Sequence, residues 1–387
     1  MICWRNILSG RNRLGQTSHC LKPGVKSAWN KNLQNPSTKS ACCMIVRFLQ
    51  TGDSKHTPHL SDPENTGKRQ KGVNFDTLGS WNNRLDMPIS VKQSIEKGRL
   101  IPKIPVDEIG TASLLGRRKV NEDRLSYEQI SDDLMYFAIF DGHGGNTAVD
   151  FAQKFMLKHI EYWLTKTSNL FDVLHNSFIE VNNLLTRHIV TYSLGTEGST
   201  GTTATVCLLR NGIELVVAHV GDSRAIMCRE GESLRLSHDH VPDDQEEAVR
   251  IKQCGGSIVD NSLGVSHVNG RLTMTRSIGD IELKPFGVTA EPYIRSIRIK
   301  HGVDAFLLLN TDGLSFVLND QELMDIITSC STPSEAAHLI TDQALQFGSE
   351  DNSTAMVIPF GAWGKYRSTT RSIPYSFGRN LSSNRYS

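Results

Sequence analysis

The sequence has no Asp or Glu before Asp53, no CxxC pair among its eight cysteines and no apolar run of bilayer-spanning length. The missing CxxC pairs argue against a zinc site, and the irregular cysteine spacing argues against a disulfide scaffold. The missing apolar run predicts a chain with no membrane span. The net charge of +1 over 387 residues indicates neither a nucleic-acid partner nor an acidic one.

The charge distribution sets the N-terminal segment apart from the rest of the chain. Arg and Lys are scattered through residues 1–50 without an acid, and Trp4, Ile7 and Leu8 can share one face of a short helix. A basic, acid-free segment with an amphipathic start predicts a mitochondrial transit peptide. The alternative is a basic arm that binds nucleic acid. The basic residues are spaced rather than clustered, which disfavours this alternative.

Residues 106–361 are predicted to form the folded domain. Strand-like runs within 203–237 are separated by two-residue Asn-Gly and Glu-Gly turns, which predicts one antiparallel meander. Helical patterns flank the strands without regular βαβ alternation, so the fold class is predicted to be α+β, a central antiparallel β-sandwich flanked by α-helical layers. Residues 51–105 are expected to be a linker and strap, and 362–387 a flexible basic tail.

Acidic residues stand where several apolar strands are expected to begin or end. The run YFAIF stops at Asp141, and AFLLLN is followed two residues later by Asp312. Comparable positions are held by Glu122, Asp123, Asp222 and Asp351. Carboxylates crowded at one sheet edge repel one another, and a divalent metal is the simplest compensation. Oxygen ligands without nearby Cys or His pairs suit Mg²⁺ or Mn²⁺ better than Zn²⁺.

Asp141 by itself allows two other interpretations. It could cap the helix that follows it, with the glycines serving only the turn. A dinucleotide-binding fingerprint also has a strand, a glycine turn and a helix, but Thr147 stands at its third glycine position, so this interpretation fails.

Six motifs follow one another along the chain: YFAIFDGHGG, GTTATV, VGDSRAI, LTMTRSIGD, TDGL and EDNSTAMV. In this order and spacing they resemble the metal-dependent (PPM, type 2C) protein serine/threonine phosphatases. The basic leader, the segment SWNNRLDMPI and the segment PFGAWGKY resemble the mitochondrial matrix member, which acts on the branched-chain α-keto acid dehydrogenase complex. The resemblance therefore implies a hydrolase of the mitochondrial matrix whose partner is a phosphorylated protein, with that complex as the candidate.

The resemblance also implies a site that holds two Mn²⁺ or Mg²⁺ ions between the sheets. Asp141 would bridge the ions, and the Gly142 carbonyl would join the coordination of one. Other oxygens would come from Asp123, Asp312 and Asp351, with Glu122, Asp222 and Asp280 as possible ligands or supporting residues. A water held between the metals would be acidic enough to attack phosphorus without a covalent phosphoenzyme.

Arg118 and His143 are the candidate catalytic side chains. Arg118 is a planar double donor close to Glu122 that suits the oxygens of a substrate phosphate, although a surface charge on a turn is the alternative. His143 could protonate the departing Ser or Thr oxygen. Asp280, in RSIGD, could be a peripheral metal ligand or a turn acid.

Rival functions find less support in the sequence. A serine nucleophile at Ser266 is disfavoured because Val268 stands where a nucleophile elbow needs glycine. A pseudophosphatase scaffold would be marked by loss of the bridging acid, and Asp141 is present. A nuclease would need a basic stripe with interleaved aromatics, which the middle of the chain lacks. Phe316 replaces an acid that many relatives use, so a third metal site is predicted to be weak.

Overall fold

The computed structural model describes residues 101–192 and 198–367. The predicted transit peptide and nearly all of the linker and strap lie outside the described residues, as does the tail beyond residue 367. The predictions for those segments therefore stay predictions. Nothing in the described part is a helix long and apolar enough to cross a membrane.

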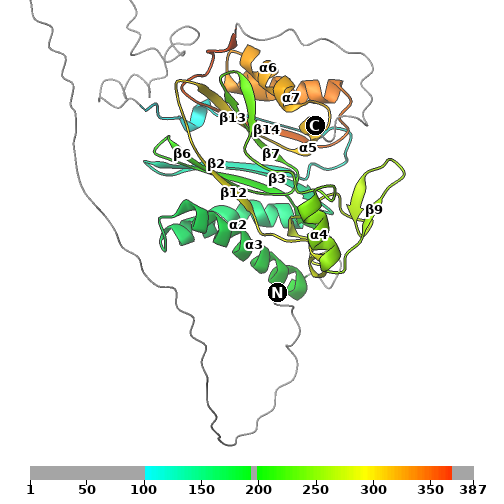
Figure 1. Ribbon diagram of the computed structural model, residues 1–387. Helices are drawn as coiled ribbons and strands as arrows, with labels where there is room; N and C mark the ends of the chain where they lie inside the picture. The colour runs from blue at the N-terminus through cyan, green and yellow to red at the C-terminus, as the bar shows by residue number, and fades with distance from the viewer. Residues whose placement is uncertain (1–100, 193–197, 368–387) are drawn as a thin grey trace, which may run out of the picture. The chain divides into compact units, whose positions relative to one another are not determined.

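Two antiparallel sheets form the centre of the domain (Figure 1). The five-stranded sheet has the order β1-β14-β13-β7-β8, and the seven-stranded sheet has the order β11-β4-β3-β5-β6-β12, with β2 also paired to β3. The first contains β1 (Gly110–Leu114), β7 (Arg224–Arg229), β8 (Glu232–Arg235), β13 (Asp304–Asn310) and β14 (Ser353–Pro359). The second contains β2 (Asp123–Ser131), β3 (Leu134–His143), β4 (Gly201–Thr202), β5 (Ala204–Arg210), β6 (Glu214–Val220), β11 (Ile278–Gly279) and β12 (Tyr293–Arg298).

Helices cover the outer face of each sheet. α2 (Thr147–Leu164) and α3 (Leu170–Tyr192) share a buried apolar cluster with the seven-stranded sheet. α6 (Asp320–Ser329) and α7 (Pro333–Gln346) share another with the five-stranded sheet, and a third cluster fills the space between the sheets. This confirms the predicted α+β sandwich flanked by helical layers. The short helices are η3 (Val106–Glu108), η4 (Lys284–Phe286) and α5 (Asp312–Ser315).

Strand β3 shows why the run YFAIF is apolar throughout. Phe137 and Ile139 point into the core between the sheets, whereas Tyr136, Ala138 and Phe140 point toward the helices. Because both faces of the strand are buried, apolar residues do not alternate with polar ones. The strand is thus fixed on both sides, and its last residues reach the edge of the sandwich in a defined position.

The predicted single meander is divided between the two sheets. β5 pairs with β6 and β7 pairs with β8, but β6 lies in the seven-stranded sheet and β7 in the five-stranded one. The chain crosses at Gly221, whose φ of +104° favours glycine and whose Cβ would lie 2.5 Å from the Thr203 side chain. The meander prediction was wrong here because strand spacing alone does not say which sheet a strand joins.

A small subdomain stands at one end of the sandwich, and we call residues 245–288 the flap. It contains α4 (Gln245–Gln253) and the hairpin of β9 (Ile258–Asp260) and β10 (Ser266–Val268), seen to the right in Figure 1. The flap has its own apolar core: Ile251, Val268, Leu272, Met274, Leu283 and Val288. Helix α4 begins after Asp244, whose side chain accepts hydrogen bonds from the backbone amides of Glu246 and Glu247.

The packed domain continues past residue 361. Ala362 and Trp363 are 1% and 2% exposed and lie in the core beneath α6 and α7. The Trp363 indole Nε1 donates to the Ser331 carbonyl, 3.3 Å away. The start of the predicted tail is therefore part of the fold, because one large aromatic residue is enough to anchor a polar segment.

Candidate functional site

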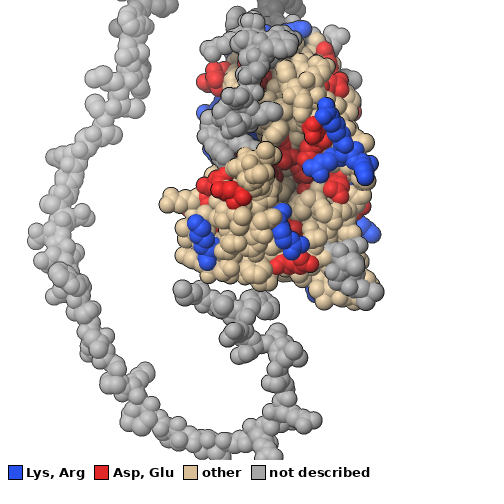
Figure 2. Space-filling model, turned by 90° about the vertical axis from the view of Figure 1, so that its right-hand side faces the viewer, with Lys and Arg blue, Asp and Glu red and all other residues tan. Residues whose placement is uncertain are grey.

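Four of the predicted metal ligands come from the ends of paired strands. The register of β2 and β3 places Asp123 directly opposite Asp141. Asp312 follows β13 and Asp351 precedes β14, and these two strands are antiparallel neighbours in the other sheet. The acids thus lie at one edge of both sheets. Figure 2 shows acidic side chains in a hollow of the face that it views, with basic side chains beside them.

The electrostatics show that these carboxylates lie close to one another. Burial raises the pKa of Asp141 well above its usual range, and nearby negative charges raise it further. Those charges belong to Asp123, Asp312, Asp222 and Asp351. Like charges that act on one partly buried group indicate that these carboxylates are close neighbours.

Asp123 and Asp222 show the same effect. Burial raises the pKa of Asp123 to about 7, although hydrogen bonds from Thr354 and Thr311 lower it. Those hydroxyls donate to its Oδ2 at 2.6 and 3.0 Å. Burial, followed by the charge of Asp312, raises the pKa of Asp222 to about 7.

The donor set fits divalent cations. Oδ1 of Asp123 and Oδ1 of Asp222 are buried and have no hydrogen-bond partner among the described residues. In the part of the chain that the structure describes, no three His, Cys, Asp or Glu side chains are grouped as a ready-made metal cage. The fit therefore rests on unpartnered buried carboxylate oxygens and on repulsion that a hard cation would relieve.

The turn after Asp141 is built around Gly142 and Glu122. A Cβ on Gly142 would lie 2.7 Å from the Glu122 carbonyl oxygen, so no side chain fits there. The Gly142 amide donates to that carbonyl at 3.1 Å, and the Glu122 carboxylate accepts from the Gly145 amide at 2.9 Å. Glu122 therefore holds the glycine turn in place.

Thr202 and Thr203 fix the backbone of Asp141. The Asp141 amide donates to the Thr203 hydroxyl at 3.0 Å, and its carbonyl accepts from the Thr203 amide at 2.8 Å. The Thr202 hydroxyl donates to the same carbonyl at 3.0 Å. The GTTATV motif thus positions the acid that is expected to bridge the metals.

Arg118 lies at the mouth of the acidic pocket. Its guanidinium donates to Oδ2 of Asp351 at 2.6 Å. Burial would lower the pKa of Arg118, but Asp351, followed by Asp312 and Asp141, raises it. The side chain is 58% exposed, so a substrate can reach it.

His143 is paired with Asp280. Its Nε2 lies 2.9 Å from both carboxylate oxygens of Asp280, which is 2% exposed. Burial would lower the pKa of His143, but the hydrogen bond and charge of Asp280 raise it above the ordinary value. The sequence does not indicate this pair, since the two residues stand 137 positions apart in the chain.

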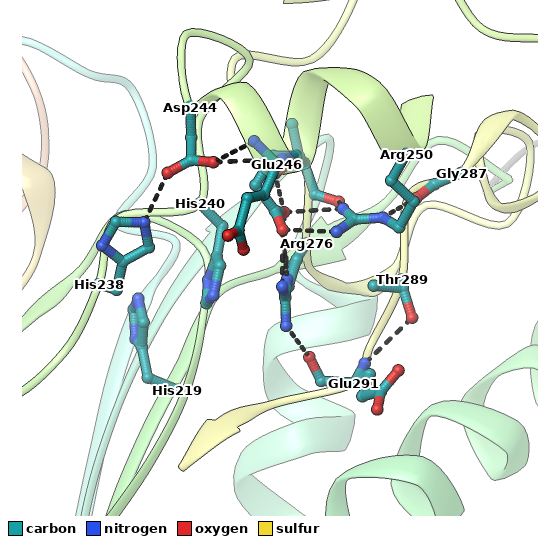
Figure 3. Close-up of polar contacts among 12 residues, drawn as sticks. His219, His238, His240, Asp244, Glu246, Arg250, Arg276, Gly287, Thr289 and Glu291 are labelled. Atoms are coloured by element: carbon teal, nitrogen blue, oxygen red, sulfur yellow. Dashed lines mark hydrogen bonds and ion pairs between the residues drawn. The ribbon is translucent and has the colours of Figure 1, made fainter. Parts of the chain in front are cut away.

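Two buried histidines hold the turn that carries Asp222. The His219 Nε2 donates to the Gly221 carbonyl at 2.9 Å, and the Gly221 amide donates to Nδ1 of His240 at 3.2 Å. Their rings stack with centroids 5.1 Å apart, next to His238 (Figure 3). Burial lowers the pKa of His219 to about 4 and that of His240 to about 2, so both rings are neutral. Their role is structural, and the spacing of the histidines along the sequence does not indicate it.

Comparison with known proteins now defines the class. Residues 109–353 match the model of the family "Protein phosphatase 2C". The chain belongs to this family, and it is a metal-dependent protein serine/threonine phosphatase.

Individual relatives refine this result. The chain is 48% identical over 309 residues to "Protein phosphatase 1K, mitochondrial" of Xenopus laevis, covering 80% of this chain and 82% of that protein. It is 35% identical to "Protein phosphatase 2C homolog 1" of Saccharomyces cerevisiae, covering 58% and 82% of the two chains.

Solved structures share the fold. A "C.elegans sex determining protein" superposes with a TM-score of 0.62 at 24% identity, covering 72% of this chain and 71% of that one. A "serine-threonine phosphatase 2C from Toxoplasma gondii" gives 0.57 at 23% identity, covering 65% and 94%. The predicted family and fold are confirmed by these comparisons.

Proposed function

We propose that this phosphatase removes phosphate from phosphoserine and phosphothreonine on mitochondrial matrix proteins, using water and a centre of two Mn²⁺ or Mg²⁺ ions. The observation that carries the proposal is the convergence of strand-end acids from both sheets on Asp141. When bound, the ions supply an acidified water and offset the charge of the phosphate.

The ligands that we propose are oxygen atoms of the chain itself. Asp141, the Gly142 carbonyl, Asp123, Asp312 and Asp351 would together hold the ions. The clamp of threonines on the Asp141 backbone supports this role, because a ligand with a fixed backbone costs less conformational entropy on binding. Asp222 retains an unpartnered buried oxygen and is our candidate for a weaker third site, where Phe316 can offer no oxygen.

Arg118 and His143 are proposed to act on the substrate. Arg118 would exchange part of its pairing with Asp351 for the phosphate oxygens and so orient the monoester for in-line attack. His143 would donate a proton to the departing Ser or Thr oxygen. The carboxylate of Asp280 beside its ring supports a proton-carrying role.

The location and the substrate rest on resemblance. The Xenopus laevis relative is named as mitochondrial, and the basic, acid-free N-terminal segment predicts import into mitochondria. The leader, SWNNRLDMPI and PFGAWGKY segments resemble the matrix member that acts on the branched-chain α-keto acid dehydrogenase complex. We therefore propose that complex as the partner, to be tested against a panel of other matrix phosphoproteins.

The metal assignment is tested with Asp312→Ala. The purified full chain should release phosphate from a phosphothreonine peptide only with Mn²⁺ or Mg²⁺ present, and this variant should abolish the release. Asp342→Ala is the matched control, because Asp342 is exposed on α7, and it should keep full activity. Full activity of Asp312→Ala would show that the proposed metal site is wrong.

A further inference from the structure

One buried side chain holds both ends of the loop that joins the two sheets. Residues 115–122 connect β1 of the five-stranded sheet to β2 of the seven-stranded sheet and belong to neither strand. Asn352, which is 5% exposed, lies beside this loop just before β14. Its amide nitrogen donates to the Leu115 carbonyl at 2.8 Å and to the Val120 carbonyl at 3.3 Å. Its amide oxygen accepts from the Glu122 backbone amide at 2.9 Å. Both hydrogens and the oxygen of this one amide are therefore engaged by the loop.

The loop also rests against the backbone just before Asn352. Gly116 has a φ of +64°, and a Cβ there would lie 2.2 Å from the Asp351 carbonyl oxygen, so the two segments touch. The Arg117 amide donates to the Glu350 carbonyl at 3.0 Å, and the side chains of these two residues form an exposed ion pair at 2.6 Å. Exposed ion pairs contribute little to stability. The buried amide of Asn352, rather than this pair, is therefore expected to fix the loop.

Arg118 stands between Leu115 and Val120, the two residues whose carbonyls Asn352 holds. Its guanidinium donates to Oδ2 of Asp351 at 2.6 Å, and the Asn352 backbone amide donates to Oδ1 of the same carboxylate at 2.8 Å. The planar fork of an arginine binds a phosphate well only when its direction is set. Because Arg118 belongs to no helix or strand, its direction depends on how the ends of the loop are held.

We propose that Asn352 is a positioning residue for phosphate binding: its amide clamps loop 115–122 so that Arg118 is aimed at the phosphate before substrate arrives. The inference rests on the proposed role of Arg118 in binding the phosphate of the monoester. A loop that is held in advance loses little conformational entropy when phosphate binds, whereas a loose loop has to be ordered at that moment. In this proposal Asn352 contacts neither phosphate nor metal, and its side chain acts through Arg118.

The alternative role for Asn352 is to orient Asp351 as a metal ligand, because its backbone amide donates to that carboxylate. The two roles divide between backbone and side chain. Asn352→Ala keeps the backbone amide and removes the side-chain contacts to the loop. Titration of the metal-free full chain with Mn²⁺ in a calorimeter therefore separates the roles. Phosphate positioning predicts a dissociation constant for Mn²⁺ that is unchanged in Asn352→Ala, and a weakened Mn²⁺ affinity would overturn it.

The kinetic test uses the full-length enzyme with a phosphothreonine peptide as substrate and inorganic phosphate as a competing product. Because a small misplacement of a binding group is costly, Asn352→Ala should raise KM for the peptide by about 10-fold or more. The inhibition constant of phosphate should rise by a similar factor. Arg118→Ala should raise both constants at least as much. The double variant should be no worse than Arg118→Ala, because one residue acts through the other.

Asp304→Asn is the control for lost stability. Asp304 is buried, like Asn352, but it lies at the start of β13, whereas Asp312 follows the end of that strand. There it pairs with Arg229 at 2.6 Å. A domain that is only less stable contains fewer active molecules, which lowers the apparent kcat and leaves KM and the phosphate inhibition constant unchanged. Asp304→Asn should show that pattern, so raised constants in Asn352→Ala identify positioning rather than lost stability.

Hydrogen exchange of the Glu122 amide gives a readout that needs neither a variant nor turnover. This amide donates to the Asn352 side chain at 2.9 Å, so in the wild type with Mg²⁺ it should be protected before phosphate is added. Inorganic phosphate should then change its exchange rate little. If the amide exchanges freely until phosphate is added, the loop is not held in advance and the inference is wrong. This measurement also decides the case in which Asn352→Ala does not fold.

The outcomes separate the inference from the proposed function. If Arg118→Ala raises KM and the phosphate inhibition constant but Asn352→Ala lowers only kcat, the inference fails and the phosphate role of Arg118 stands. The same holds if the effects of the two variants add in the double variant. If Arg118→Ala changes neither constant, both the inference and the proposed role of Arg118 fail.

Discussion

Glu247 is the centre of a network of hydrogen bonds and ion pairs within the flap. It lies on α4, and its side chain is 3% exposed. It accepts hydrogen bonds from the guanidinium of Arg250 at 2.7 Å and from that of Arg276 at 2.6 Å, as well as from the Thr275 hydroxyl. Arg276 also donates to the Glu291 carbonyl at 3.0 Å (Figure 3). We predict that Glu247→Gln destabilises the domain.

The magnitude follows from the two arginines, which lose the negative charge that they pair with. Burial would raise the pKa of Glu247, but the bonds from Arg250, Arg276 and Thr275 hold it below its usual range. The carboxylate is thus ionised in the fold. Glutamine keeps one acceptor oxygen but turns an amide toward a guanidinium, so two partly buried cations lose their negative partner. Breaking a buried pair in this way costs about 3–5 kcal/mol, or a fall in Tm of roughly 10 °C.

The assay is thermal and urea denaturation of the full chain at pH 7, with Glu246→Gln as the control. Glu246 is the neighbouring residue on α4 and is exposed, so its variant should remain within about 0.5 kcal/mol of the parent. Since the folded pKa of Glu247 is depressed, its contribution is present above the ordinary carboxyl pKa of about 4.3 and is lost as pH falls below it. The difference between parent and Glu247→Gln should therefore shrink in acid.

This reasoning would be refuted if Glu247→Gln unfolded at the same temperature and the same urea concentration as Glu246→Gln. It would mean that the two arginines find water or other acceptors at no cost, so that the contacts in Figure 3 contribute nothing to stability. Hydrogen exchange gives an independent measure, because α4 amides should exchange faster in Glu247→Gln if the network anchors the flap.

Two further changes test other parts of the fold. Burial lowers the pKa of His219 to about 4, so the stability that depends on its neutral form is present above about pH 6.5 and is lost as pH falls toward 4. This loss amounts to roughly 3 kcal/mol. In urea titrations at several pH values, His219→Gln should abolish this pH-dependent loss of stability, whereas the exposed control His188→Gln should keep it. If the pH dependence of stability is unchanged in His219→Gln, His219 is not its source. Trp363→Ala should lower the free energy of unfolding by about 3–5 kcal/mol, and a loss no larger than that of the exposed Lys365→Ala would show that the domain ends earlier.

The candidate site was predictable where its residues follow from local patterns. Asp141 and Asp312 stand at the ends of apolar runs that predict buried strands. Where these strands end therefore determines where the two carboxylates lie. The same holds for the turn at Gly142, because the run of glycines after Asp141 is visible in the sequence. The ordered motifs then identified the family, which the comparisons confirm.

The partners of these residues were not predictable, because they come from distant parts of the chain. Asp123 accepts a hydrogen bond from Thr354, 231 positions away in the sequence, and His143 contacts Asp280, 137 positions away. Spacing along the sequence carries no information about such pairs until the sheets are assembled. The crossing at Gly221 was not predictable for the same reason. A turn between two strands can join strands of one sheet or strands of two different sheets.

The sequence by itself therefore determined the fold class, the strand-end acids and the glycine turn, because burial and backbone sterics act on neighbouring residues. The tertiary structure alone decided that the acids lie close together, that His143 has a carboxylate behind it and that Arg276 links Glu247 of α4 to the Glu291 carbonyl. Those features depend on hydrogen bonds and charges between segments that only the packing of two sheets brings within a few ångströms of one another.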